Sequence, residues 1–187
     1  MSWLQKTVNQ SSSQWQMPGQ QILMAKMLVP VEVFAGGDIT EAPKRIAALK
    51  SLKDIHNTGA LLTYEQQQRL MSVMPYNLDV WDGYPKERED LYAMFNAQNK
   101  RLVVAAGDTH NAWHSELKDN KGNIVDVEFA TPSISSLGRE KYLKLDNNIA
   151  QVVAENLSSL IAELEYCNLH QRGYMNVTIT PESSSAK

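Results

Sequence analysis

The sequence has little cysteine and no excess of positive charge. Cys167 is the single cysteine among 187 residues, which excludes an internal disulfide framework and any metal site built from cysteines alone. We expect it to be a small buried residue. The 18 basic residues form no cluster and are outnumbered by 21 acidic ones, giving a net charge of -3. This balance predicts no nucleic-acid-binding surface.

Long hydrophobic runs are also absent. The longest apolar stretch, "ILMAKMLVPVEVF", is interrupted by Lys26, Pro30 and Glu32 and is too short to span a membrane. The first residues, "MSWLQKTVNQSSSQ", lack the basic-then-apolar order of a signal peptide. We therefore expect a soluble chain without an export signal.

What is present suffices for a core. Hydrophobic residues make up 43% of the chain, and we expect a single domain over residues 1–182 and a polar, frayed tail at 183–187. The patterns predict helices near 2–13, 42–55, 63–74, 85–98 and 148–164. They predict strands within 15–29, 101–107, 123–131 and 173–180. The fold class is therefore α/β (α+β).

Local signals support several of these elements. Thr63 and Gln66 fit a capping box that opens a helix ending before Pro75. Pro85 fits a first helical turn, and a stripe of apolar residues follows it. The run "RLVVAAG" is typical of a strand buried on both faces of a sheet.

The main candidate site follows that strand, in "GDTHNAWH". Asp108 offers a carboxylate and His110 an imidazole on the same side of an extended segment, while Asn111 offers a carbonyl oxygen that we expect to contact substrate. Ligands of such sheets bind beyond the carboxyl ends of strands, and mixed oxygen and nitrogen donors suit a metal site for phosphoryl chemistry. The alternative is an ordinary strand end, in which the carboxylate of Asp108 accepts hydrogen bonds from the next turn.

A second candidate is "WDGYP". Trp81 and Tyr84 would form an aromatic pocket wall, and Asp82 would orient a polar group of the substrate. The alternative is an Asx turn in which Asp82 caps the following helix. His56 is expected to be exposed, and we favour solvent over an anionic substrate as the surroundings of His170 and Arg172.

The order of these segments resembles a known family. "SWLQKTVNQSSSQWQMPGQQILMAKM", "WDGYPKEREDL", "LVVAAGDTHNAWHSEL", "DVEFATPSISS" and "LEYCNLHQRGYMNVTITPE" are similar to the C-terminal part of the alkaline phosphatase D (PhoD-like) family. The resemblance covers residues 3–182, with a variable insertion at about 35–70. It implies the C-terminal portion of a calcineurin-like metallophosphoesterase sandwich, with a mixed sheet flanked by helices. It also implies hydrolysis of phosphate mono- or diesters, iron and calcium ions, and a periplasmic or secreted location for complete members.

By this resemblance, Asp108 would be a metal ligand and His110 a ligand or a catalytic group that contacts phosphate. Trp81, Asp82 and Tyr84 would line the mouth of the site. The family's upstream ligand segments, among them a ligand cysteine, are absent here. We therefore expect the C-terminal part of such an enzyme, with a minority of the metal ligands and no activity by itself. The alternatives are a non-catalytic, self-associating α/β module or remnant of a phosphoesterase, and an unrelated α/β fold.

Overall fold

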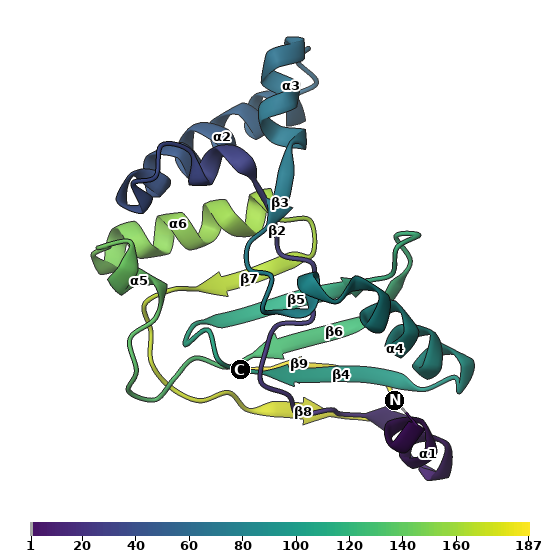
Figure 1. The fold of residues 1–187 in the computed structure, drawn as a ribbon. Helices are drawn as coiled ribbons and strands as arrows, with labels where there is room; N and C mark the ends of the chain where they lie inside the picture. Colours follow the sequence, from purple (N-terminus) through teal and green to yellow (C-terminus); the bar gives the residue numbers. More distant parts are fainter. Residues whose placement is uncertain (1) are drawn as a thin grey trace.

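The computed structural model describes residues 2–187, and its centre is a five-stranded mixed sheet (Figure 1). The parallel strands lie at one side and the antiparallel ones at the other. In spatial order the strands are β1 (Trp15–Gln16), β4 (Arg101–Ala106), β6 (Ile124–Ala130), β5 (Ala112–Lys118) and β7 (Leu164–Asn168). Two small antiparallel pairs lie outside this sheet: β2 (Leu28–Pro30) with β3 (Val73–Pro75), and β8 (Val177–Ile179) with β9 (Ser184–Ala186).

Helices flank the sheet in two groups. The helix α4 (Pro85–Ala97) lies over one face, where Leu91, Tyr92 and Phe95 pack with Leu102 and Val104 of β4. The helices α2 (Ala42–Asn57) and α6 (Asn147–Leu160) contact each other near β7 (Figure 1). The remaining helices are α1 (Ser2–Gln10), α3 (Tyr64–Met71), α5 (Arg139–Tyr142) and the short 3-10 turns η1 (Val31–Phe34), η2 (Ile39–Glu41) and η3 (Trp81–Gly83). None of the helices within residues 2–187 has the length and hydropathy needed to span a bilayer.

The α/β class and several element signals are confirmed. Thr63 caps α3, and both bonds of the capping box to Gln66 are present. Pro85 opens α4, and the strand β4 is largely buried. These elements depend on short-range patterns, so their own residues sufficed to predict them.

Two predictions in the second half of the chain were wrong, and one strand was missed. The helix expected to reach residue 164 ends at Leu160, and Leu164 begins the strand β7. The strand β5 was not predicted, although its buried and half-exposed side chains alternate. The tail is not frayed, because Ser184–Ala186 pairs with β8.

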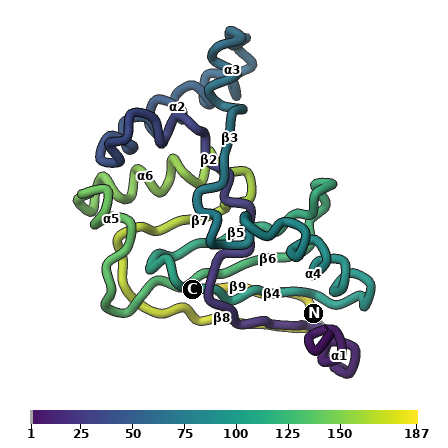
Figure 2. Tube along the Cα trace, viewed as in Figure 1, coloured from purple at the N-terminus to yellow at the C-terminus, as the bar shows by residue number. Residues whose placement is uncertain are grey.

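The expected strand–turn–strand at 15–29 was right only at its two ends, where β1 and β2 lie. After the two residues of β1, the chain crosses the sheet without regular structure before reaching β2 (Figure 2). Residues 20–27, which we call the crossing segment, are held by three acidic side chains from elsewhere in the chain. The amides of Met24 and Ala25 donate to Glu128, that of Lys26 to Glu163, and that of Met27 to Asp82. A segment whose amides are bound to carboxylates does not need a neighbouring strand.

Candidate active site at the end of strand β4

The turn after β4 has an unusual backbone. Asp108 and His110 have φ angles of 63° and 59°, so the segment is left-handed at both residues and not extended as predicted. Within residues 2–187, only Asn99 and Lys144 are further non-glycine residues with positive φ. Such conformations are sparsely populated and cluster at functional sites. The turn is fastened by two bonds of 2.7 Å, from the Thr109 amide to the Gly107 carbonyl and from Trp113 Nε1 to Thr109 Oγ1.

His110 is oriented by the loop that follows β6. Its Nδ1 lies 2.9 Å from the carbonyl oxygen of Leu137. Because a carbonyl only accepts hydrogen bonds, Nδ1 carries the proton in the neutral ring, and Nε2 keeps its lone pair. A histidine that binds a metal uses this arrangement, donating from one nitrogen to a backbone carbonyl and coordinating through the other.

Asp108 is exposed and has few protein partners. In the described part of the chain, its carboxylate accepts one hydrogen bond, from Gln21 Nε2 at 3.5 Å. The amides of the following turn do not donate to it within residues 2–187, so the Asx-turn alternative has no support from the geometry. Its carboxylate therefore remains available to a ligand.

The parallel pairing of β4 with β6 creates this edge. Both strands end at the same side of the sheet, and the amide of Thr131 donates to the carbonyl of Ala106 at 3.0 Å. The loops at 107–111 and 131–138 therefore lie together, as the rule for open α/β sheets requires. The Leu137 carbonyl, which orients His110, is a backbone group and therefore gives no signal in the sequence pattern.

Asn111 is fully buried beneath these loops. Its Nδ2 donates to the carbonyl of Leu169 at 2.9 Å, and its Oδ1 accepts from the amide of Arg139 at 3.0 Å. Both ends of the side-chain amide are thus occupied within the protein. The predicted contact between Asn111 and substrate does not agree with this placement, and the residue instead ties the turn after β4 to the start of α5 and to Leu169, just after β7.

Gly138 provides a test of that role. An alanine Cβ at this position would lie 2.4 Å from Asn111 Nδ2, which is below any real contact distance. We expect Gly138→Ala to lower the free energy of unfolding by about 1–3 kcal/mol, measured by urea denaturation, because the buried amide must shift. Gly19→Ala is the matched control, since nothing lies within 4 Å of its added Cβ. Equal losses in the two variants would contradict the role given to Asn111.

The "WDGY" segment forms η3 and the entry to α4. Asp82 is buried, and its carboxylate pairs with Arg88 Nη1 at 2.8 Å and accepts from the Met27 amide at 2.9 Å. This placement agrees neither with a polar contact to substrate nor with a cap on α4, because both oxygens are used inside the fold. Tyr84 is 53% exposed, and Trp81 is half-buried with its Nε1 donating to Gln20 Oε1 at 2.6 Å.

The crossing segment connects the two candidate sites. Gln20 contacts Trp81, and the next residue, Gln21, contacts Asp108. The backbone is anchored to the end of β4 as well, through Gln20 N to Ala105 O at 2.9 Å and Gly107 N to Gln21 O at 3.2 Å. Sequence patterns missed this link because glutamines in an irregular segment carry no periodic signal.

The remaining candidates lie elsewhere. Cys167 is buried as predicted, and burial raises the pKa of its thiol, which disfavours a nucleophilic thiolate. His56 is exposed as predicted. We expected solvent around His170 and Arg172, and this was wrong, because Arg172 pairs with Glu140 and His170 is half-buried.

A metal centre at this edge would have a partial donor set. No cluster of three or more histidine, cysteine or acidic side chains able to hold an ion occurs within residues 2–187. Asp108 and His110 supply one carboxylate and one imidazole, the donor types that suit transition metals and calcium in phosphoryl chemistry. The two donor types fit a metal ion, and two donors would make up only part of the ligand set of one metal site.

The chain is similar to known proteins in sequence and in fold. A sequence model for the PhoD-like phosphatase family matches residues 1–187. Alkaline phosphatase D of Bacillus subtilis (strain 168) is 31% identical over 116 residues, and the match covers 59% of this chain and 18% of that protein. A solved structure described as "Structure of PhoD" superposes with a TM-score of 0.58 at 21% identity, over 96% of this chain and 26% of the other. The chain thus has the fold of part of that structure and spans a small share of the length of both relatives.

Proposed function

This chain belongs to the PhoD-like phosphatase family, and we propose that it supplies part of the active site of a metal-dependent phosphoric ester hydrolase. The observation that carries the proposal is the left-handed turn at Asp108 and His110. It leaves the carboxylate nearly free of protein partners and orients His110 through Nδ1. We further propose that the mixed sheet is the C-terminal portion of a calcineurin-like sandwich. Because the chain spans 18% and 26% of the two relatives, the activity of a whole enzyme is part of this proposal.

Asp108 and His110 would hold an ion at the edge of β4, the first through its carboxylate and the second through Nε2. Iron and calcium are the ions implied by the family resemblance. A divalent ion at such a place polarises a phosphoryl oxygen and lowers the pKa of water. Two ligands bind an ion weakly, so further donors are needed for a stable centre.

The protein's own groups would position a phosphate mono- or diester. The Leu137 carbonyl would fix the orientation of the His110 ring, so the loop that carries Leu137 would set the direction in which Nε2 points. The exposed ring of Tyr84 and the half-buried ring of Trp81 would pack against the organic part of the substrate. The bond from Trp81 to Gln20 would hold that indole in place.

We expect Asp108→Asn and His110→Ala each to lower kcat/KM by more than about 100-fold in the natural form of the protein. The amide of asparagine is a weaker ligand than a carboxylate, and alanine has no ligand at all. The measurement is hydrolysis of one phosphomonoester and one phosphodiester.

The matched control is His56→Ala, which removes an exposed histidine from α2 and should leave turnover unchanged. Unchanged turnover in both site variants would contradict the assignment. Loss with one ester only would support the site and define its preference between mono- and diesters.

A non-catalytic, self-associating module is the second candidate. The small donor set favours it, as do large apolar side chains at the surface, such as Leu61 at 98% and Ile134 at 81% exposed. Elemental analysis and light scattering of the purified chain separate the two functions. Stoichiometric iron and calcium would favour the enzyme, whereas a metal-free oligomer would favour the module.

A further inference from the structure

Glu128 is a buried acid that the proposed reaction does not use. It lies on β6, is 0% exposed, and accepts two backbone hydrogen bonds from the crossing segment. Met24 N is 2.7 Å from its Oε1, and Ala25 N is 3.0 Å from its Oε2. A carboxylate whose two oxygens each bind one of two consecutive amides fixes the position of that backbone.

The fixed backbone leads directly to the candidate site. Gln20 and Gln21 precede the bound amides by three to five residues, and their side chains meet Trp81 and Asp108. The backbone of Trp81 is bound to the same segment, through its amide to the Leu23 carbonyl at 3.2 Å. A shift of residues 24 and 25 is therefore transmitted to both sides of the site.

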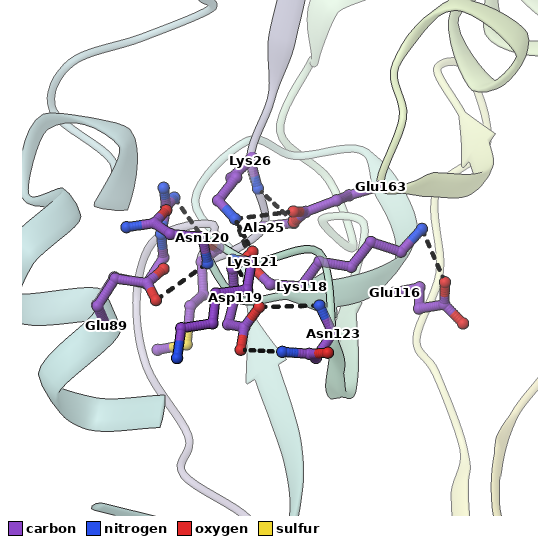
Figure 3. A network of polar contacts seen from close by, with 12 residues as sticks. Ala25, Lys26, Glu89, Glu116, Lys118, Asp119, Asn120, Lys121, Asn123 and Glu163 are labelled. Carbon is purple, nitrogen blue, oxygen red and sulfur yellow. Dashed lines mark hydrogen bonds and ion pairs between the residues drawn. The ribbon is translucent and has the colours of Figure 1, made fainter. Parts of the chain in front are cut away.

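The other bound amides do not depend on Glu128. Glu163 accepts from the Lys26 amide at 2.8 Å, and its carboxylate lies 3.5 Å from Lys26 Nζ (Figure 3). Lys26 Nζ also donates to the carbonyls of Lys118 and Asp119 at the end of β5. The segment is thus secured at Lys26 and Met27, and its other end is bound to the end of β4 through Gln20 N and the Gln21 carbonyl. Between these two anchors, the amides of residues 24 and 25 are bound by Glu128.

We propose that Glu128 is a positioning residue whose ionised carboxylate holds residues 24 and 25 and so sets Gln20 and Gln21 against Trp81 and Asp108. The functional meaning of that position rests on the proposed phosphoesterase site. The two hydrogen bonds from the Met24 and Ala25 amides to Glu128 are a property of the described fold, and they can be tested without an activity assay.

The charges around Glu128 make its ionisation sensitive to pH. The groups facing it are Glu163 before β7, Arg88 and Tyr92 on α4, and through Arg88 also Asp82 on η3. Each cation already has a closer anion, since Arg88 pairs with Asp82 and Lys26 with Glu163. Burial therefore dominates and raises the pKa of Glu128 to about 7, with the two amides and Arg88 opposing the shift and Glu163 adding to it.

Protonation of Glu128 weakens one of its two hydrogen bonds to the Met24 and Ala25 amides, because one carboxylate oxygen changes from an acceptor to a donor. One oxygen becomes a hydroxyl, which donates its proton and accepts poorly from the amide that faces it. Glu128→Gln imitates this state, because its NH₂ group faces one of the two amides donor against donor. The wild-type protein below pH 7 and the variant at any pH should therefore share one arrangement of the crossing segment.

The test follows the Met24 and Ala25 amides and the Trp81 indole N–H by NMR of the 187-residue chain from pH 5.5 to 8.5. Loss of a peak in Trp81→Phe assigns the indole signal. In the wild type we expect all three to titrate with one midpoint near 7. In Glu128→Gln none should titrate, and their shifts should match the wild type at low pH.

Asp126→Asn is the matched control, since Asp126 is a carboxylate on the same strand that accepts from Leu102 N, outside the crossing segment. It should leave the titration intact. An indole signal that still titrates in Glu128→Gln, or amides that do not titrate in the wild type, would overturn the proposal. If Glu128→Gln does not fold, unequal midpoints of the Glu128 carboxyl carbon and the indole in the wild type would overturn it. Failure of the activity test with an intact titration would reject the phosphoesterase site alone.

Discussion

Replacing Arg88 with methionine is expected to lower the free energy of unfolding by about 3–5 kcal/mol, the cost of removing one partner from a buried ion pair. The side chains of Arg88 and Asp82 are 4% and 2% exposed, and Nη1 lies 2.8 Å from Oδ1. The same nitrogen donates to the Met24 carbonyl at 3.2 Å. Methionine fills the space but leaves the carboxylate buried without a cation. The measurement is urea unfolding followed by circular dichroism.

The same helix offers a matched control. Lys86 pairs with Asp90 four residues along α4, but their side chains are 79% and 53% exposed. Lys86→Met should change stability by less than about 0.5 kcal/mol, because an exposed pair contributes little. Adding Asp82→Asn to Arg88→Met should restore about 1–2 kcal/mol of the free energy of unfolding. The asparagine removes the unpaired negative charge and still accepts the hydrogen bond from Met27 N. Equal losses at Arg88 and Lys86 would contradict this account.

The fold class followed from local patterns, whereas the crossing segment did not. Apolar patterns and a capping box predicted α3, α4 and β4. Each of these patterns depends only on residues that are neighbours in the sequence. The apolar run at 22–27 looked like a strand, yet its amides bond to Glu128, Glu163 and Asp82, which lie 55 to 137 positions away. Long-range hydrogen bonds to side chains have no periodicity, so the pattern could not reveal them.

The candidate site divides in the same way. Asp108 and His110 were predicted from their types and their place after a buried strand, and the structure puts both in the turn that ends β4. The burial of Asp82 and Asn111 was not predicted, because residue type does not report burial. A carboxylate or amide can serve a ligand or the fold, and here both groups have all their strong contacts inside the protein.

The second large effect is a pH-dependent change in stability that disappears in Glu128→Gln. The pKa of Glu128 is about 7 in the folded protein against an ordinary value of 4.5. Between these values the folded state keeps a proton that the unfolded state has lost. The stability from this group is therefore complete below pH 4.5 and is lost as pH rises through 7. At 1.36 kcal/mol per unit, the wild type should lose up to about 3 kcal/mol relative to the variant between pH 4.5 and 8.

Urea unfolding of both proteins across that range gives the difference directly. Glu116→Gln is the control, because Glu116 is partly exposed beside Lys118, and its removal takes away no buried charge. A difference between wild type and Glu128→Gln that stays flat with pH would contradict the shift. The two measurements on Glu128 report opposite consequences of one proton: acid strengthens the whole fold, since a buried charge is removed, and loosens residues 24 and 25, since one acceptor is lost. Burying this acid thus lowers stability at neutral pH while fixing the backbone beside Trp81 and Asp108.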